Sequence, residues 1–477
     1  MKYKLEWSEW ASLVVVEGIA LPIVEETDTP WNQPETNIHF AMPKDQSGAY
    51  IPAPQFRERS KKHAEFFLEP KNIELVIDKY EELLEELADY RKTIAQEDFS
   101  EIKKERLVQI LKKHLNFIKK TAKWYKGSRP EAEPAVEKEV QKRIKELFPE
   151  ENTEEIFNLL TRSPYPDPIN KERKDWIEIL EGKMTNEILL NHAKKYPPLF
   201  TNLYTEKELL NVLRNRYQED KKSLKDMKKD LEEDQNNKNK VIERQKKYLE
   251  KIKDEKFLTY LKLYHLFGVY RFKAKPGIAG MEVVGMPMLK VVADKLGLSV
   301  RDMHECLTGT EILEHLKKGT KPNKELLDKR KKCRVFMVKG TDMTVMEGEE
   351  AKEFVEKELL HEKEDKKELK GMPASPGKVK GIAKIVRANR MDEVQKAMKR
   401  FNKGEILITP NTQPNMVPLM KKAAAIVSEI GGLTSHTAIV SREFRIPCIV
   451  GVEDATHIIK DGEEVEVDAK KGLVRRL

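Results

Sequence analysis

The chain has few cysteines and no long apolar run. Three cysteines occur in the sequence, Cys306, Cys333 and Cys448, and none of them belongs to a CxxC pair. This spacing indicates neither a disulfide framework nor a cysteine zinc site. No stretch of about 18 consecutive apolar residues occurs, so we expect no membrane span.

Phosphate loops and signal peptides are also missing. No GxxxxGK[ST] loop occurs in the sequence, and no glycine-rich hairpin suited to cover ATP precedes residue 360. The segment 1–360 is too helical in pattern for an ATP-grasp fold. Glu6, Glu9 and Glu17 interrupt the apolar positions near the N-terminus, which does not fit a signal peptide. We therefore expect a cytoplasmic protein that does not turn over ATP by itself.

The charge is high in both signs. The chain has 89 Lys and Arg against 81 Asp and Glu, for a net charge of +8. Basic and acidic residues alternate in segments such as KKSLKDMKKD (221–230), which is typical of solvated helix faces. We therefore predict no nucleic-acid binding. The histidines form no HxxxH or HExxH pair, and we predict no metal site.

Helical spacing dominates the middle of the chain. Apolar residues recur at helical intervals over 73–84 and 102–124, and PYPDP (164–168) is a clear break. Residues 206–272 predict a long helical hairpin whose tip lies near 234–237, where helix propensity falls. Tryptophan and proline crowd the N-terminal segment, so we expect residues 1–70 to be an irregular segment packed on a helical domain at 71–360.

The C-terminal part of the chain has a different pattern. Residues 381–386 and 404–409 are short β-rich runs, 423–428 is an apolar run suited to a buried strand, and 464–468 alternates. Helices are expected at 391–401 and 435–444. The expected fold class is therefore multidomain: a mainly α-helical N-terminal region followed by a compact α/β domain.

One histidine in this tail has chemically suggestive neighbours. It lies in the segment GGLTSHTAIVSRE (431–443). Gly431 and Gly432 let the backbone approach a bulky anion, and Thr434 or Ser435 can cap the following helix. The first N–H groups of that helix disfavour an imidazolium and stabilise a phosphoryl group. This pattern favours His436 as a nucleophile toward phosphorus.

Four segments of the tail, in order, resemble the phosphohistidine swivelling domain of the phosphoenolpyruvate (PEP)-utilising enzymes. They are GMPASPG (371–377), ILITPNT (406–412), the block 431–443 and IPCIVG (446–451). That family includes pyruvate phosphate dikinase, phosphoenolpyruvate synthase and rifampin phosphotransferase. In it the matching histidine carries a phosphoryl group between two sites. The family often has alanine after this histidine, where the present chain has Thr437.

The resemblance implies roles for further residues. His436 is the expected carrier, and Gly431, Gly432, Thr434 and Ser435 are expected to support its phosphoryl group. Arg442 is expected to help by charge if its side chain turns toward the site. The implied swivelling domain spans 371–477, and the charged segment 361–370 is its expected hinge. Residues 270–357 weakly resemble the end of the family's helical domain, and the basic residues there, Arg271, Lys273 and Lys275, are candidate acceptor or phosphate clamps.

The family's ATP-grasp domain and PEP-binding barrel have no counterpart in the sequence. The simplest expectation is a subunit of a split phosphotransferase: an ATP-grasp partner supplies Mg-ATP, no cofactor is bound tightly, and a small molecule accepts the phosphoryl group. A non-catalytic phosphocarrier or regulatory protein is the alternative, and a scaffold that never carries phosphate is a third reading. The sequence leaves the acceptor open, as well as the choice between ATP and PEP as donor.

Overall fold

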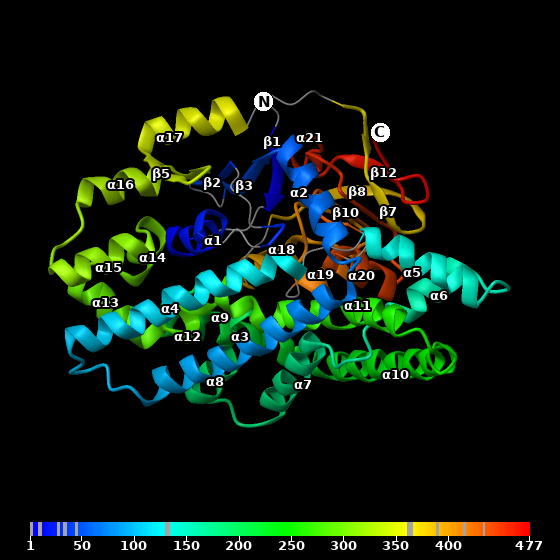
Figure 1. The fold of residues 1–477 in the computed structure, drawn as a ribbon, viewed down its shortest axis with the longest axis horizontal. Coiled ribbons are helices and arrows are strands. Elements are labelled where there is room, and N and C mark those ends of the chain that lie inside the picture. Colours follow the sequence, from blue (N-terminus) through cyan, green and yellow to red (C-terminus); the bar gives the residue numbers. More distant parts are fainter. Residues whose placement is uncertain are drawn as a thin grey trace.

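The structure is a computed structural model of the chain. It describes residues 3–7, 12–25, 29–31, 36–42, 46–128, 134–359, 366–387, 391–413, 416–432 and 435–477. Its main elements are a helical body, a small antiparallel sheet and a C-terminal α/β domain (Figure 1). The expected fold class, a helical N-terminal region followed by an α/β domain, is thereby confirmed.

The helical body runs from residue 70 to residue 332. Its longer helices are α3 (Pro70–Gln96), α4 (Lys104–Tyr125), α5 (Pro134–Leu147), α7 (Pro168–Glu181), α9 (Glu206–Lys222), α10 (Leu224–Leu249) and α11 (Glu255–Ala274). The shorter ones are α6 (Thr153–Leu160), α8 (Asn186–Lys195), α12 (Met281–Val284), α13 (Met286–Leu296), α14 (Val300–Cys306), α15 (Gly309–Lys318) and α16 (Lys324–Lys332). The apolar stripes of α3 and α4 supply much of one continuous core.

The helical hairpin predicted over 206–272 was given its turn at the wrong place. Residues 234–237 lie inside α10, and the chain breaks instead at Ser223, between α9 and α10, and again at 250–254. The Asn and Asp residues near 234 stay helical because tertiary contacts outweigh weak local propensity: Asp234 accepts a hydrogen bond from Arg173 of α7 at 2.8 Å. The segment therefore forms three helices.

The expectation that residues 1–70 are irregular is also wrong for the described residues. They contain β1 (Tyr3–Trp7), α1 (Leu13–Glu25), β2 (Asn37–Met42), β3 (Gln46–Pro52) and α2 (Ala53–Phe66). With β4 (Arg334–Lys339) and β5 (Asp342–Glu347), the strands form an antiparallel sheet in the order β1-β3-β2-β4-β5. β2 pairs with β4, and along the chain the whole helical body lies between these two strands. No local sequence pattern could therefore reveal the sheet. α17 (Gly348–Phe354) and a π-helical turn (Val355–Leu359) follow it.

The C-terminal domain is built on a second sheet. Its order is β6-β13-β12-β8-β9-β10-β11-β7, and the run β8-β9-β10-β11 is parallel. The strands are β6 (Glu368–Lys370), β7 (Met372–Ser375), β8 (Lys378–Ile385), β9 (Ile406–Thr409), β10 (Ala425–Ser428), β11 (Cys448–Val450), β12 (Glu464–Asp468) and β13 (Leu473–Arg476). The helices are α18 (Met391–Arg400), α19 (Val417–Met420), α20 (His436–Glu443) and α21 (Ala455–Ile458).

The boundary of this domain lies earlier than predicted. β6 pairs with β13 and buries Leu369, so residues 368–370 belong to the domain and not to the expected hinge at 361–370. Burying Leu369 against the sheet favours this pairing over an extended linker. Residues 361–365 of the expected hinge lie outside the described residues.

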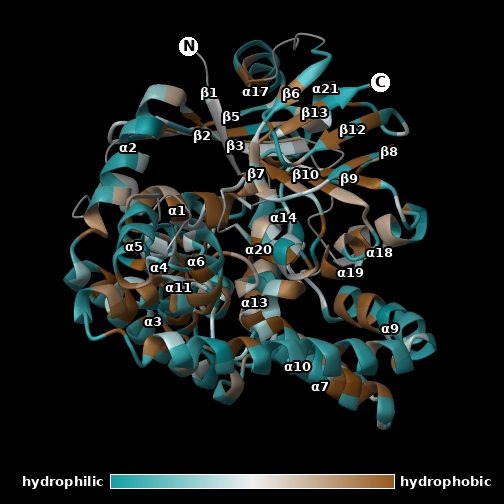
Figure 2. Cartoon of the chain, turned by 90° about the vertical axis from the view of Figure 1, so that its right-hand side faces the viewer, coloured by the Kyte–Doolittle hydropathy of each residue, from teal (hydrophilic) through white to brown (hydrophobic). Residues whose placement is uncertain are grey.

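The apolar core of the C-terminal domain is separate from the apolar core of the helical body. Its two buried apolar clusters lie within 369–474, whereas the two clusters of the helical body lie within 14–327. Among the described residues no buried apolar cluster spans both. In Figure 2, α10 is mostly hydrophilic along its length.

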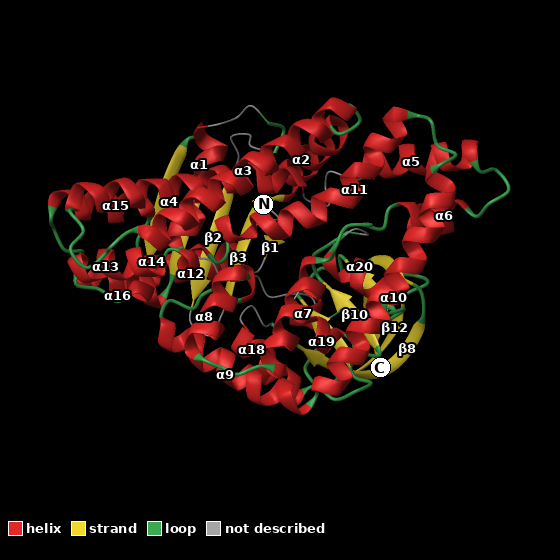
Figure 3. Ribbon diagram, turned by 90° about the horizontal axis from the view of Figure 1, so that it is seen from below, coloured by secondary structure: helices red, strands yellow, loops and turns green. Residues whose placement is uncertain are grey.

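Ion pairs connect the two parts instead. Lys399 of α18 lies 2.8 Å from Glu219 of α9, and Lys421 lies 3.4 Å from Asp230 and 3.7 Å from Asp234 of α10. These groups are all accessible to solvent, so each pair is worth only about 0–1 kcal/mol and weakens with salt. Figure 3, seen from below, shows α18 beside α9. No helix among the described residues is long and apolar enough to cross a membrane.

A buried charged group holds α7, α8 and α9 together, and we predict that its loss destabilises the fold. Glu172 lies 2.8 Å from Nε2 of His192 and accepts a 2.6 Å hydrogen bond from Arg216. Glu172→Ala leaves the buried Arg216 with Asp220, 3.2 Å away, as its remaining carboxylate, and should lower the free energy of unfolding by about 3 kcal/mol. Urea titration measures this, and Glu178→Ala, on the exposed face of the same helix, is the control.

The same carboxylate should make stability depend on pH. Burial raises the pKa of Glu172, but the Arg216 charge and hydrogen bonds from His192 and Arg216 outweigh it and lower the pKa to about 2. A lowered folded-state pKa stabilises the fold fully above the unfolded value, near about 4.3, and this contribution is lost as the pH falls toward 2. Equal acid sensitivity of wild type and Glu172→Ala would contradict the assignment.

Candidate functional site

His436 is the first residue of α20, where the carboxyl ends of β9 and β10 meet. These strands are parallel and pair Thr409 with Ser428, so the loops that follow them lie side by side. Ser435 caps the helix: its Oγ accepts a 3.3 Å hydrogen bond from the N–H of Ala438. The first turn of the helix therefore begins at the imidazole, at the edge of a parallel sheet where ligands commonly bind.

Glycine is required just before this helix. Gly431 has φ +131°, and a Cβ placed on it would lie 2.8 Å from Oγ of Ser435, the capping atom. The carbonyl of Gly432 then accepts a 3.0 Å hydrogen bond from the N–H of Ser435. Both glycines line the cavity in front of His436. Thr434, predicted to support the phosphoryl group, lies outside the described residues.

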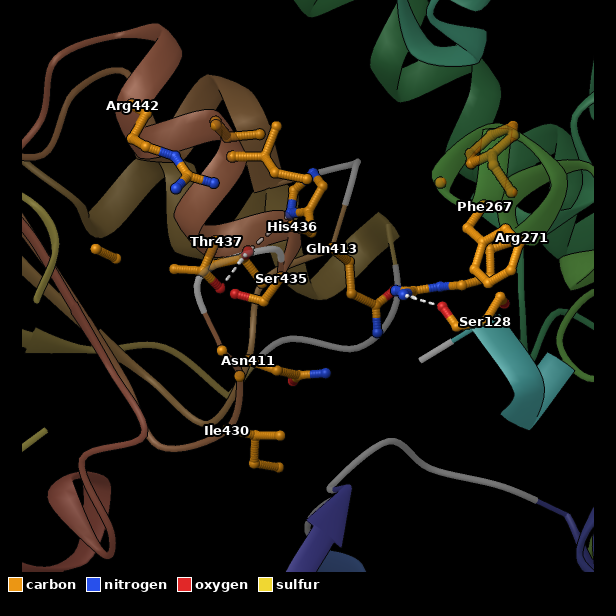
Figure 4. A pocket seen from close by; sticks show the side chains of 18 of the residues that line it. Ser128, Phe267, Arg271, Asn411, Gln413, Ile430, Ser435, His436, Thr437 and Arg442 are labelled. Carbon is orange, nitrogen blue, oxygen red and sulfur yellow. Dashed lines mark hydrogen bonds between the residues drawn. The ribbon is translucent and has the colours of Figure 1, made fainter. Parts of the chain in front are cut away.

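A threonine relay fixes the orientation of the imidazole. Nδ1 of His436 lies 2.7 Å from Oγ1 of Thr412, which lies 2.9 Å from Oγ1 of Thr437 (dashed lines in Figure 4). When Nδ1 carries the proton, Thr412 accepts its hydrogen bond and donates its own proton to Thr437. Nε2 then keeps its lone pair, which is the tautomer that a nucleophilic imidazole needs.

The surroundings keep this imidazole neutral. Burial, followed by the positive charges of Lys275 and Arg271, lowers the pKa of His436 to about 3. At neutral pH the ring is therefore neutral, with one nitrogen free of a proton and available for attack on phosphorus. The same positive charges that disfavour a protonated ring would attract the negative charge of a phosphoryl group and so stabilise it once it is bound.

Two of the three basic residues predicted as a clamp lie near His436. Arg271, in the last turn of α11, and Lys275 line the same cavity as His436. In Figure 4, Arg271 extends from the helical body toward the loop that carries Gln413, and it donates a 3.0 Å hydrogen bond to the carbonyl of Ser128. Lys275 is buried. Spacing of four residues at the helix end places both side chains on one face.

The other two predicted basic residues, Lys273 and Arg442, differ in position. Lys273 is exposed, and its ammonium lies 5.7 Å from the ring centre of Tyr270, because a residue two positions along a helix points to another side. Arg442 lines the cavity, and its charge acts on Glu137 of α5 and on the thiol of Cys448. Its predicted role at the phosphoryl group stays a prediction.

The cavity in front of His436 has a volume of about 2370 Å³ and lies between the domains. Its walls come from the ends of β9 and β10, from α20, from α10 and α11, and from α1 and α2 of the N-terminal region. It can therefore hold a small molecule that contacts the helical body and His436 together.

The residue that sequence reasoning missed is Thr412. It ends the segment ILITPNT, which carried part of the resemblance, but was given no role of its own. Nothing local in the sequence pairs it with His436, because α19 and β10 lie between the two along the chain. The parallel pairing of β9 with β10 brings the two loops together, and that pairing was not predicted.

Comparison with known proteins places the domain in a family. Residues 401–472 match the family described as "PEP-utilising enzyme, mobile domain". Residues 401–472 therefore match the mobile domain of PEP-utilising enzymes, the family that the resemblance in the sequence indicated.

Relatives with curated names are similar over part of this chain only. A probable phosphoenolpyruvate synthase of Staphylothermus marinus is 45% identical over 147 residues, which are 29% of this chain and 17% of that protein. The phosphoenolpyruvate synthase of Pyrococcus furiosus is 42% identical over 146 residues, 30% of this chain and 16% of that protein. A pyruvate kinase of Bacillus licheniformis is 46% identical over 80 residues, 17% of this chain and 14% of that protein. The matches thus span less than a fifth of each relative's length.

We predict that Thr412 controls the reactivity of His436. Thr412→Val keeps the shape but removes the partner of Nδ1, so the rate of His436 phosphorylation should fall by about 10- to 100-fold, the scale found when the orienting partner of a histidine is removed. Thr437→Val, which removes only the far end of the relay, is the matched control and should cost less. Equal rates for Thr412→Val and wild type would show that the hydrogen bond is incidental.

The titration of His436 provides a separate check. Because its pKa is lowered to about 3, the ring should remain neutral from about pH 8 to about pH 5, where an ordinary histidine gains a proton. Lys275→Met removes one of the charges that oppose the imidazolium and should move the pKa upward. NMR of ring-labelled histidine measures both, and protonation of wild-type His436 near about pH 6.5 would contradict the described environment.

Proposed function

We propose that the chain is the phosphoryl-carrying subunit of a split phosphotransferase. His436 takes a phosphoryl group from a donor and delivers it to a small molecule bound against the helical body. The observation that carries the proposal is the position of a neutral His436 opposite Arg271 and Lys275, two basic groups of a different domain, across one shared cavity. A cavity of this size with convergent basic groups favours an acceptor-binding enzyme over a phosphocarrier without catalysis.

The chemistry follows from the tautomer. In the first step Nε2 attacks the donor's phosphorus, an N–P bond forms and the donor's leaving oxygen departs. In the second step the N–P bond breaks, its electron pair returns to Nε2, and an acceptor oxygen forms the new O–P bond. Arg271 and Lys275 neutralise charge on the equatorial oxygens, so both steps depend on positioning and electrostatics.

A partner supplies the donor in this proposal. The sequence contains no GxxxxGK[ST] loop, and the synthases that the chain resembles are far longer than the shared part. We infer that an ATP-grasp protein binds Mg-ATP and phosphorylates His436. PEP, which gives these relatives their name, is the competing donor.

Delivery to two sites requires movement of the C-terminal domain. One imidazole cannot meet a distant donor and the acceptor cavity in a single pose. The separate apolar clusters and the solvent-accessible ion pairs at the boundary support a domain that leaves the helical body as a unit.

Labelled ATP tests the split arrangement. We expect γ- or β-labelled ATP to transfer label to His436 only when the ATP-grasp partner is present, and His436→Ala to take up none, because the substitution removes the nucleophile. The label should be lost in acid and stable in alkali, as a phosphoramidate is. Labelling of the isolated chain by ATP would sink the split-enzyme proposal, and full phosphotransfer activity of His436→Ala would sink the carrier proposal.

The ion pairs at the boundary provide a test of movement. Lys399→Glu combined with Lys421→Glu replaces attraction by repulsion at Glu219, Asp230 and Asp234. For each 1 kcal/mol of docking free energy lost, the ratio of undocked to docked molecules should rise about fivefold. Spin-label distances between α10 and the turn after β12 report the shift, and added salt should act in the same direction. Lys470→Glu, in that turn, is the control. Unchanged distances in the double variant would argue for a fixed domain.

A further inference from the structure

The carbonyl groups at the end of α4 are bound by side chains from distant parts of the chain. The last carbonyls of an α-helix have no partner within the helix itself. Trp31 donates a 2.7 Å hydrogen bond to the carbonyl of Lys123, and Nε2 of His63 lies 3.0 Å from the carbonyl of Gly127. Side chains of the N-terminal region therefore fix the 3₁₀ turn that follows α4 (Lys126–Ser128).

Close packing restricts the same turn further. A Cβ placed on Gly127 would lie 2.8 Å from Cζ2 of Trp31, so the turn has no room to shift toward that ring. Ser128 donates a 3.1 Å hydrogen bond from its hydroxyl to the carbonyl of Tyr125. The hydroxyl of Tyr80 in α3 lies 2.5 Å from Oγ of Ser128, and it is the donor because the proton of Ser128 is already engaged.

This turn holds Arg271 of α11. Nη1 of Arg271 donates a 3.0 Å hydrogen bond to the carbonyl of Ser128 (Figure 4), and its guanidinium carbon lies 5.9 Å from the ring centre of Tyr125. Among the described residues Arg271 forms no ion pair with a carboxylate. A guanidinium has several further N–H donors, so one bond to a neutral carbonyl orients the group and leaves its charge and most of its donors for an anion.

We propose that the turn Lys126–Ser128 positions Arg271 for the phosphoryl group on His436. Tyr80 and His63 are then positioning residues, which act on the transfer only through this turn. The inference rests on the proposed function. The turn and Arg271 both line the cavity in front of His436, and the charge of Arg271 acts on that imidazole. A guanidinium that is already oriented stabilises the transferring group without reorganising at the moment of transfer.

Phosphorylation of His436 in the full chain tests the inference. Phosphoramidate is the donor, since it is small and needs no partner protein, and low salt preserves the ion pairs of the docked pose. ³¹P NMR follows phosphohistidine at several donor concentrations, which gives the maximal rate and the KM separately. We expect Arg271→Met to lower the maximal rate by about 100-fold, because it removes a donor to the transferring group.

Tyr80→Phe is the variant that tests positioning. It keeps the buried ring but removes the hydroxyl that holds Ser128, so the maximal rate should fall by about tenfold while the KM changes little. Tyr270→Phe is the matched control. Tyr270 stacks on Tyr80 with ring centres 5.6 Å apart, but its hydroxyl donates to Glu81 and not to the turn, so its loss should leave the rate unchanged.

His63 provides a second, independent pair of variants. His63→Leu removes the group that binds the carbonyl of Gly127 and should slow the phosphorylation of His436 as Tyr80→Phe does. His63→Gln keeps an N–H donor and should restore part of the rate. The melting temperature of each variant reports whether it is folded.

A double-variant cycle decides whether Tyr80 acts through Arg271. Under the proposal, Tyr80→Phe costs about tenfold in the wild-type background but less than about twofold in Arg271→Met, because residues that act as one unit are not additive. A tyrosine that only supports the packing of α3 and α4 would cost the same factor in both backgrounds.

The outcomes separate the positioning role from the carrier role. A wild-type chain that takes no phosphoryl group on His436 contradicts the proposed function and the inference with it. A chain that is phosphorylated normally in Arg271→Met, or in which Tyr80→Phe costs the same factor with and without Arg271, overturns the positioning role and leaves the carrier role standing.

Discussion

The site depends first on one hydrogen bond, between Thr412 and Nδ1 of His436. It holds the ring across two loops that follow neighbouring parallel strands, and it occupies Nδ1, so that Nε2 is the nitrogen left to meet phosphorus. Helix capping by Ser435 and the close approach permitted at Gly431 place the ring where this bond can form. Burial and the charges of the opposite domain then keep the ring neutral.

The division of apolar packing makes a carrier role physically reasonable. The C-terminal domain completes its own apolar clusters and meets the helical body through solvent-accessible ion pairs. Such a boundary is easily broken, whereas a shared apolar core would fix the domain in one pose. The basic groups that face His436 belong to the helical body, so under the proposed function they would stabilise a phosphoryl group on His436 only while the domain is docked.

Local sequence signals predicted the elements that depend on local pattern. The helix that begins at His436, its cap at Ser435 and the strand at 464–468 follow from capping, glycine spacing and alternation. The strand pairings did not follow: β2 pairs with β4 from the other end of the helical body, and Thr412 reaches His436 only because β9 lies beside β10. Helix propensity also misplaced the break near 234, where contacts with α7 keep the chain helical. The clamp pair Arg271 and Lys275 was within reach of sequence reasoning, since their four-residue spacing separates them from Lys273.

The measurement that tests the account most directly is the identity of the phosphorylated nitrogen. Heteronuclear NMR on ring-labelled phosphorylated chain, supported by tandem mass spectrometry of the His436 peptide, distinguishes the two ring positions. Because Thr412 occupies Nδ1, the account predicts phosphate on Nε2 of His436 and on no other residue. Phosphate on Nδ1, or on a different side chain, would contradict it.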